Sequence, residues 1–188
     1  MNDYFRYSER LLLVQAYSDW IKKCYDQGWE GYLFSFMFNH ISGSRDARVN
    51  EMQKDLYRWY GRLLTRMYRN PRSSNSIELL PKAVLFPDSP VPKHDKQPLR
   101  DVTVNEGLHC HGVLMAHDWG RLGCSLHLHT QRKQGVYLTD KLRRIDVQPI
   151  THAPEYVTEY AIKALKRPGS SLDHVMILPR SKKELPAG

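Results

Sequence analysis

The segment 31–39 places the strongest limit on how this chain can fold. It has the length of a β-strand, and apolar side chains occur at both sets of alternating positions, one set being Tyr32, Phe34, Phe36 and Phe38. Successive side chains of a strand point to opposite faces of the sheet. The pattern therefore predicts a central strand whose two faces are both largely covered.

Hydrophobic periodicity predicts helices elsewhere in the chain. Apolar side chains recur at steps of about four residues over 4–26, and at steps of three and four over 45–69. A proline in the first turn favours a helix that begins at Pro154 and runs to about Lys166. Residues 121–133 are also predicted to be helical. Further strands are expected over 77–86, 141–150 and 174–178.

A second apolar run, 108–115, contains two histidines separated by one residue. In a strand, His109 and His111 point to the same face of the sheet. Two imidazoles on one face form half of a metal site and need one or two further ligands. The alternative is that one histidine is a hydrogen-bonded core residue and the other is exposed to solvent.

A neighbouring strand is expected to supply the next ligand. Segments 99–104 and 108–115 flank a short turn that contains glycine, and this pattern predicts a β-hairpin. One register of this hairpin sets Asp101 opposite His111, on the imidazole face. A shift by one residue would remove Asp101 from that face, and Glu106 in the turn is then the fallback ligand.

The charge balance points to a polyanionic partner. The chain has 188 residues, with 28 Lys and Arg against 20 Asp and Glu, which gives a net charge of +8. Such an excess favours nucleic acid first and an acidic membrane second. The three cysteines form no CxxC pair, so a disulfide scaffold is not expected and a reducing compartment is. The apolar run 11–14 is too short to cross a bilayer, and we expect a cytoplasmic protein without a membrane partner.

A row of cations is predicted on one side of the 45–69 helix. At 100° per residue these side chains fall within about a third of the helix circumference. The row could follow a phosphate backbone. It could equally be a solvated face, because Glu51 and Asp55 lie near enough to neutralise part of it. The cations are Lys54, Arg58, Arg62, Arg66 and Arg69.

The helix that begins at Pro154 is predicted to have aromatic and basic side chains together on the face opposite its apolar side. Tyr156, Tyr160, Lys163 and Arg167 lie within about 60° of one another on a helical wheel, broadly opposite the apolar side. The tyrosines are therefore outside the apolar stripe, although ordinary amphipathic tyrosines would also fit. A phenol is a weak nucleophile at neutral pH, and a neighbouring lysine together with a metal-polarised phosphate would help it to attack phosphorus.

The ordered set of motifs resembles the HUH endonuclease superfamily, in particular two-tyrosine rolling-circle replication initiators (Rep) and related single-strand transposases. The resemblance covers about residues 30–167. Its three parts are the hydrophobic strand 34–39, the His109-Cys110-His111 strand, and the helix with Tyr156, Tyr160 and Lys163. The chain departs from the family at Glu159, where many two-tyrosine members have lysine, and the third metal ligand has no unambiguous match.

The resemblance implies an α+β fold of the ferredoxin-like or RRM-like HUH type, with a central antiparallel sheet of about five strands and flanking helices. One domain would span 1–188, with an N-terminal helical extension over about 1–28 and a short charged C-terminal tail. It implies Mg²⁺ or Mn²⁺ held by His109, His111 and Asp101. Tyr160 or Tyr156 would then nick single-stranded DNA through a 5′-phosphotyrosine, with Lys163 assisting.

The partners implied are single-stranded DNA at a replication origin or at the end of a mobile element, and a host replication helicase. The basic stripe and Arg167 would hold the DNA backbone in a plasmid, phage or transposon system. Two alternatives remain open. One is a non-catalytic domain that binds single-stranded nucleic acid, and the other is a zinc hydrolase that adds His127 or His129 to the first histidine pair.

Overall fold

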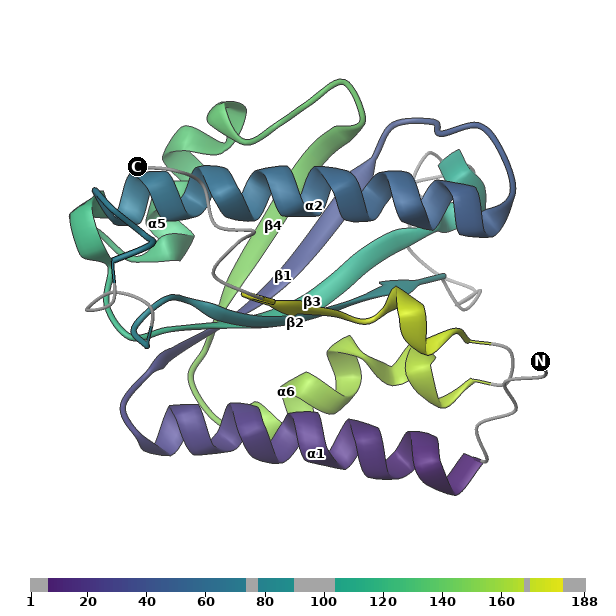
Figure 1. The fold of residues 1–188 in the computed structure, drawn as a ribbon, viewed down its shortest axis with the longest axis horizontal. Coiled ribbons are helices and arrows are strands. Elements are labelled where there is room, and N and C mark those ends of the chain that lie inside the picture. The colour runs from purple at the N-terminus through teal and green to yellow at the C-terminus, as the bar shows by residue number, and fades with distance from the viewer. Residues whose placement is uncertain (1–6, 74–77, 90–103, 168–169, 181–188) are drawn as a thin grey trace.

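A five-stranded antiparallel sheet forms the middle of the molecule. The computed structural model describes residues 7–73, 78–89, 104–167 and 170–180. The strands lie in the order β4-β1-β3-β2-β5, so β3 is the central one (Figure 1). They are β1 (Glu30–Phe38), β2 (Lys82–Asp88), β3 (His109–Ala116), β4 (Leu142–Ile150) and β5 (Met176–Leu178).

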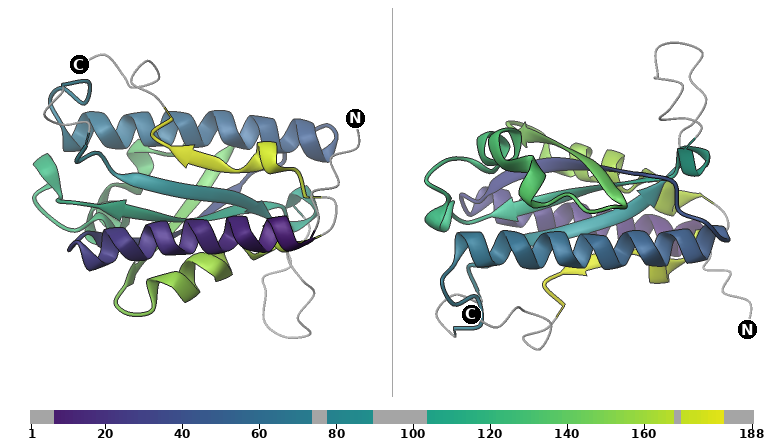
Figure 2. Two further views of the ribbon diagram at one scale, coloured as in Figure 1. Left: turned by 60° about the horizontal axis from the view of Figure 1, so that its bottom comes forward. Right: turned by 90° about the horizontal axis from the view of Figure 1, so that it is seen from above.

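Helices cover both faces of this sheet, as the aromatic strand requires. Helix α2 (Arg45–Met67) lies along one face, and α1 (Tyr7–Asp26) and α6 (Pro154–Ala161) lie side by side on the other (Figures 1 and 2). A short helix, α5 (Leu126–Lys133), flanks the C-terminal half of α2. The expected α+β class, with about five antiparallel strands and flanking helices, is confirmed.

The aromatic side chains of β1 build the core under α2. Phe34 and Phe36 stack on each other and both contact the ring of Trp59 from α2, with centroids 5.1 and 4.7 Å from it. Phe36 is fully buried and Trp59 is 2% exposed. The apolar stripe predicted for the 45–69 helix is therefore the buried one, as the periodicity indicates.

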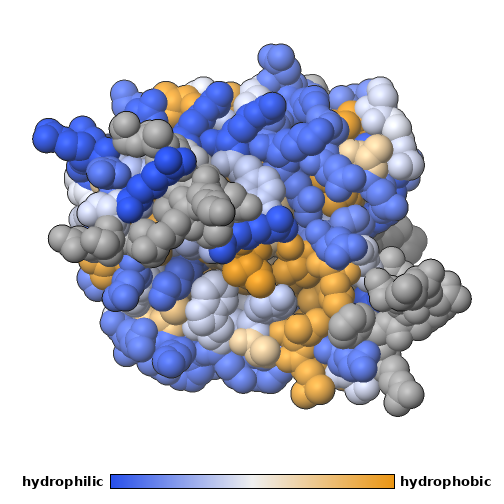
Figure 3. Space-filling model, viewed as in Figure 1, coloured by the Kyte–Doolittle hydropathy of each residue, from blue (hydrophilic) through white to orange (hydrophobic). Residues whose placement is uncertain are grey.

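The opposite face of β3 forms a second, smaller core. Val113 and Met115 pack with Val14 and Ile21 of α1 and with Ala161 at the end of α6. In the view of Figure 3, hydrophilic surface covers most of α2, and apolar surface gathers between the two helical layers. Within the described residues, no helix is long and apolar enough to span a membrane.

The predicted hairpin of 99–104 with 108–115 is wrong. Strand β3 pairs with β1 along one edge and with β2 along the other, so no edge is left for a hairpin partner. Residues Val104–Gly107 form a 3₁₀ turn instead, in which Asn105 and Glu106 have positive φ. The buried Asn105 side chain accepts from the Ile41 N–H and donates to the Asn39 carbonyl, which fixes this turn at the start of β3.

The other elements follow the predicted ranges with shifted ends. The 121–133 helix divides into a 3₁₀ turn over Gly120–Leu122 and α5. The 154–166 helix ends at Ala161 and continues as a 3₁₀ helix over Lys163–Lys166. The strand expected over 77–86 begins later and ends later, at Asp88.

Candidate metal centre

The two histidines of β3 face the same side of the sheet. The Nε2 atoms of His109 and His111 are 2.8 Å apart, and the rings meet edge to face. Both side chains are half-buried on the face that α1 and α6 cover. Two ligands at about 2.1 Å on adjacent positions of one metal ion would be about 3 Å apart. The spacing therefore suits a pair of neighbouring ligands.

Neighbouring groups orient both rings. His109 Nδ1 lies 2.7 Å from the Gly107 carbonyl oxygen, so Nδ1 carries the proton and Nε2 keeps its lone pair. His111 Nδ1 lies 2.8 Å from Ser35 Oγ on the adjacent strand. Burial, and then the neighbouring His109, lower the pKa of His111 to about 4. The imidazole of His111 is therefore neutral at physiological pH, which is the form that binds metals.

A buried aspartate from β2 completes a group of three. Asp88 is the residue opposite His109 in the antiparallel pairing, so its side chain lies on the imidazole face. It is 2% exposed. The ligand atoms of Asp88, His109 and His111 all lie within 4.8 Å of one another. Two strands that pair directly therefore supply three possible ligands.

Asp88 takes the place that the hairpin register gave to Asp101. Asp101 itself lies outside the described residues, but the register on which it was chosen does not exist. The positions opposite His111 are occupied by Ser35 and Phe86. Asp88 was missed because the preceding Pro87 made the strand seem to stop at Phe86. Extending the alternation of Val84 and Phe86 by one step would have found it.

The fallback ligand Glu106 lies away from this group. Its side chain is 82% exposed and pairs with Arg48 of α2 at 3.0 Å.

Two cations from the segment after α6 reach the same carboxylate. Lys163 Nζ lies 3.4 Å from Asp88 Oδ2, and Arg167 Nη1 lies 3.3 Å from Oδ1. Both cations are about one third exposed, at 35% and 37%. The positive charge of Lys163 also contributes to the lowered pKa of His111. The structure therefore brings Lys163 and Arg167 together with the histidine pair.

The tyrosine helix lies on this face of the sheet. Lys163 Nζ sits 4.1 Å from the centre of the Tyr160 ring, so this lysine connects the tyrosine with the Asp88 carboxylate. Tyr160 is 43% exposed and Tyr156 is 70% exposed. Both phenols are therefore accessible to a large substrate. Glu159, at the position where many two-tyrosine HUH endonucleases have lysine, pairs with Lys166 at 3.0 Å.

A buried arginine holds the segment that carries these cations. Arg10 of α1 is 5% exposed. Its Nη1 lies 3.2 Å from the Leu165 and Arg167 carbonyl oxygens and 2.8 Å from that of Ser170. This clamp fixes the chain on both sides of Arg167, and sequence patterns gave no indication of it.

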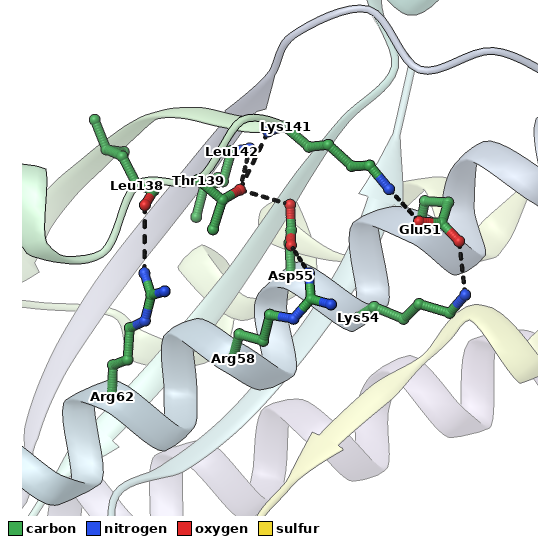
Figure 4. Close-up of polar contacts among 9 residues, drawn as sticks. All are labelled: Glu51, Lys54, Asp55, Arg58, Arg62, Leu138, Thr139, Lys141 and Leu142. Atoms are coloured by element: carbon green, nitrogen blue, oxygen red, sulfur yellow. Dashed lines mark hydrogen bonds and ion pairs between the residues drawn. The ribbon is translucent and has the colours of Figure 1, made fainter.

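The basic stripe of α2 lies on the other side of the sheet, over the aromatic core. Most of its cations have partners (Figure 4). Lys54 pairs with Glu51, Arg58 pairs with the buried Asp55, and Arg62 donates to two carbonyl oxygens. Asp55 also accepts a hydrogen bond from Thr139 at 2.8 Å. The structure does not bring these cations together with the histidine pair.

The second His-x-His pair does not join the group either. His127 Nδ1 lies 2.7 Å from the Val147 carbonyl oxygen. His129 is buried and contacts the Tyr137 hydroxyl through Nε2 at 2.7 Å. Both belong to α5, against the core on the α2 side. They are therefore separated from His109 and His111 by the sheet.

The donor set fits a divalent metal ion. Two oriented imidazole nitrogens and one carboxylate oxygen converge, and the two cations beside Asp88 hold that carboxylate in place. A mixed set of imidazole and carboxylate ligands does not single out one divalent metal ion. Comparisons with protein-family models, with curated proteins and with solved structures gave no match.

Proposed function

We propose that this protein nicks and joins single-stranded DNA through a 5′-phosphotyrosine intermediate, in the manner of HUH endonucleases. The observation that carries the proposal is the group of Asp88, His109 and His111 on the face that the tyrosine helix covers. Lys163 contacts both the carboxylate of this group and the Tyr160 ring. Initiation of rolling-circle replication or of transposition would be the biological role.

His109, His111 and Asp88 would hold Mn²⁺ or Mg²⁺, which supplies Lewis-acid polarisation of the scissile phosphate. The remaining chemistry belongs to the side chains above the sheet. Lys163 would neutralise charge that develops on the phosphate oxygens, because its ammonium group lies between the carboxylate and the tyrosine. Arg167, fixed by the Arg10 clamp, would bind a neighbouring phosphate of the strand.

The covalent step uses a tyrosine as the nucleophile. The phenolic oxygen of Tyr160 bonds to phosphorus as the phenol loses its proton to solvent. The bond between phosphorus and the 3′ oxygen breaks, and that oxygen takes a proton to give a free 3′-OH. The 3′ part of the strand remains on the enzyme through its 5′ phosphate. Attack by a 3′-OH on this phosphotyrosine reverses the step and joins strands, and Tyr156 would accept a second strand.

A labelled covalent adduct tests this proposal. The protein is incubated with Mn²⁺ and a pool of single-stranded oligonucleotides, and the products are separated on a denaturing gel. A label at the 3′ end should stay with the protein, whereas a label at the 5′ end should leave on a fragment with a free 3′-OH. Retention on a native gel with no adduct at any label position would favour the non-catalytic binding domain instead.

Matched variants assign the roles. Tyr160→Phe and Tyr156→Phe should each lower adduct formation, and the double variant should abolish it. Tyr7→Phe is the control, because Tyr7 of α1 is comparably exposed at 63% and lies outside the group. An adduct that survives the double variant unchanged would contradict the tyrosine mechanism. His111→Ala should abolish the adduct together with metal binding.

A further inference from the structure

A basic cavity lies at the opposite end of α2 from the 104–107 turn that precedes the histidine strand. It has a volume of about 550 Å³ and opens between the last turns of α2, the 3₁₀ turn over 120–122, and α5. This size is within the range of small-molecule pockets. Its polar lining consists chiefly of Arg66, Arg121, Arg132, Lys133, Cys124 and His129.

Among the residues that the structure describes, the charged side chains lining this cavity are all cations. Four lining residues are cations and none is a carboxylate. In the described ranges 7–73, 78–89, 104–167 and 170–180, none of these four cations forms an ion pair with an acidic side chain. The contrast with the rest of α2 is clear in Figure 4, where Lys54 and Arg58 have acidic partners. Four cations at one cavity, with no acidic partner in the described part of the chain, create a strong local attraction for an anion.

The positive charges around the cavity also act on His129, which is one of its lining residues. His129 is buried there, and burial lowers the pKa of its imidazole, with Arg66 and Lys133 lowering it further. Leu122 and Val136 give the cavity an apolar wall beside its cations. A ligand that has both a flat, partly apolar part and several negative oxygens would satisfy both surfaces.

We propose that this cavity binds the phosphate groups of a nucleotide, with Arg66, Arg121, Arg132 and Lys133 around the phosphate oxygens. The apolar wall supports the remainder of the nucleotide. The nucleotide is either free in solution or part of a single strand, since both present the same phosphate chemistry. The proposal goes beyond the nicking function and does not rest on it, because the cavity and the histidine pair lie on opposite faces of the sheet.

Cys124 offers a local measure of occupancy. It lines the cavity and is half-buried, whereas Cys24 and Cys110 are buried at 2% and 3% exposure. Alkylation by iodoacetamide, followed by peptide mass spectrometry, therefore reports on this cavity selectively. The protein is treated in EDTA, which excludes metal-dependent nicking, with either ATP or a ten-nucleotide oligothymidylate as the probe. We expect a saturating probe to slow the modification of Cys124 at least tenfold.

The two probes distinguish the sources of the ligand. Protection by ATP alone assigns a free nucleotide, and protection by the oligonucleotide, with or without ATP, assigns a strand. For whichever probe protects Cys124, Arg66→Ala and Arg132→Ala should each weaken its binding about tenfold, as measured by calorimetry. This is the loss expected for one charged contact to phosphate.

Lys23→Ala is the charge-matched control. Lys23 is an exposed cation near the end of α1, in the helical layer on the other face of the sheet. Its removal should leave binding within about twofold. Absence of Cys124 protection by both probes would overturn the proposal. Equal weakening by Lys23→Ala and Arg66→Ala would overturn it too, because the attraction would then be a property of the net charge alone.

Discussion

The Asp88→Asn substitution best distinguishes an effect on metal binding from an effect on the stability of the fold. Asp88 is almost completely buried, and its charge is balanced by Lys163 and Arg167. Removing one member of a fully buried ion pair costs about 3–5 kcal/mol. Here both cations are about one third exposed and regain water, so we expect a smaller loss of about 1–2 kcal/mol. For a domain of this size the melting temperature should fall by about 2–8 °C.

The larger effect should appear when metal is added. At a Mn²⁺ concentration one hundred times its dissociation constant, a native-state ligand stabilises by about 2.7 kcal/mol. This raises the wild-type melting temperature by about 5–11 °C. Losing the only carboxylate of the group should weaken binding at least a hundredfold. The same Mn²⁺ concentration then stabilises the variant by at most about 0.4 kcal/mol.

Asp55→Asn is the matched control. It is 1% exposed, against 2% for Asp88, and it also pairs with an arginine. It belongs to α2, on the other face of the sheet, so this variant should lose stability but keep the full metal-dependent rise. Scanning calorimetry with Mn²⁺ and with EDTA measures both quantities. An equal rise in Asp88→Asn and wild type, or no rise in wild type, would refute the metal centre.

Three further changes test how the site is supported. A Cβ on Gly112 would lie 2.8 Å from Leu85 Cα. Gly112→Ala should therefore lower the free energy of unfolding, measured in urea, by about 1–3 kcal/mol. A change below about 0.5 kcal/mol, the level of a neutral surface substitution, would contradict this. Ser35→Ala removes the hydrogen bond to His111 and should weaken Mn²⁺ binding about tenfold by calorimetry, while stability in EDTA changes little. Arg10→Met removes the guanidinium donor from three carbonyl oxygens, of which that of Arg167 still accepts from the Ser170 N–H, so amide exchange over 163–167 should accelerate, and unchanged protection there would argue against the clamp.

Local periodicity was enough to predict the layers of this protein. The alternation of β1 and the stripe of α2 are properties of short segments, and burial enforces both. The shared face of His109 and His111 follows from the same two-residue period. The closeness of Tyr160 and Lys163 also follows from their spacing of three residues, even though α6 ends between them at Ala161 and Lys163 belongs to the 3₁₀ helix that follows.

Pairing between distant segments could not be predicted in this way. The hairpin expectation assumed that neighbours in sequence pair in space, but β3 pairs with β1, which precedes it by more than seventy residues. The choice of Asp101 as the third ligand depended on that assumption. Likewise, spacing along α2 indicated that Asp55 lies near Arg58, but it could not show that the Val136 and Leu138 carbonyl oxygens would occupy Arg62.

The Arg10 clamp also has a consequence for the order in which parts of this protein fold. Its hydrogen bonds join residues 155 to 160 positions apart in the chain. During synthesis, β1, β2 and β3 can pair and bring Asp88 to the histidines while the residues after 160 are still inside the ribosome. Contacts of such separation form late, because closing a long loop is entropically costly. Asp88, His109 and His111 can therefore come together without the neighbouring cations, well before Lys163 and Arg167 arrive beside Asp88.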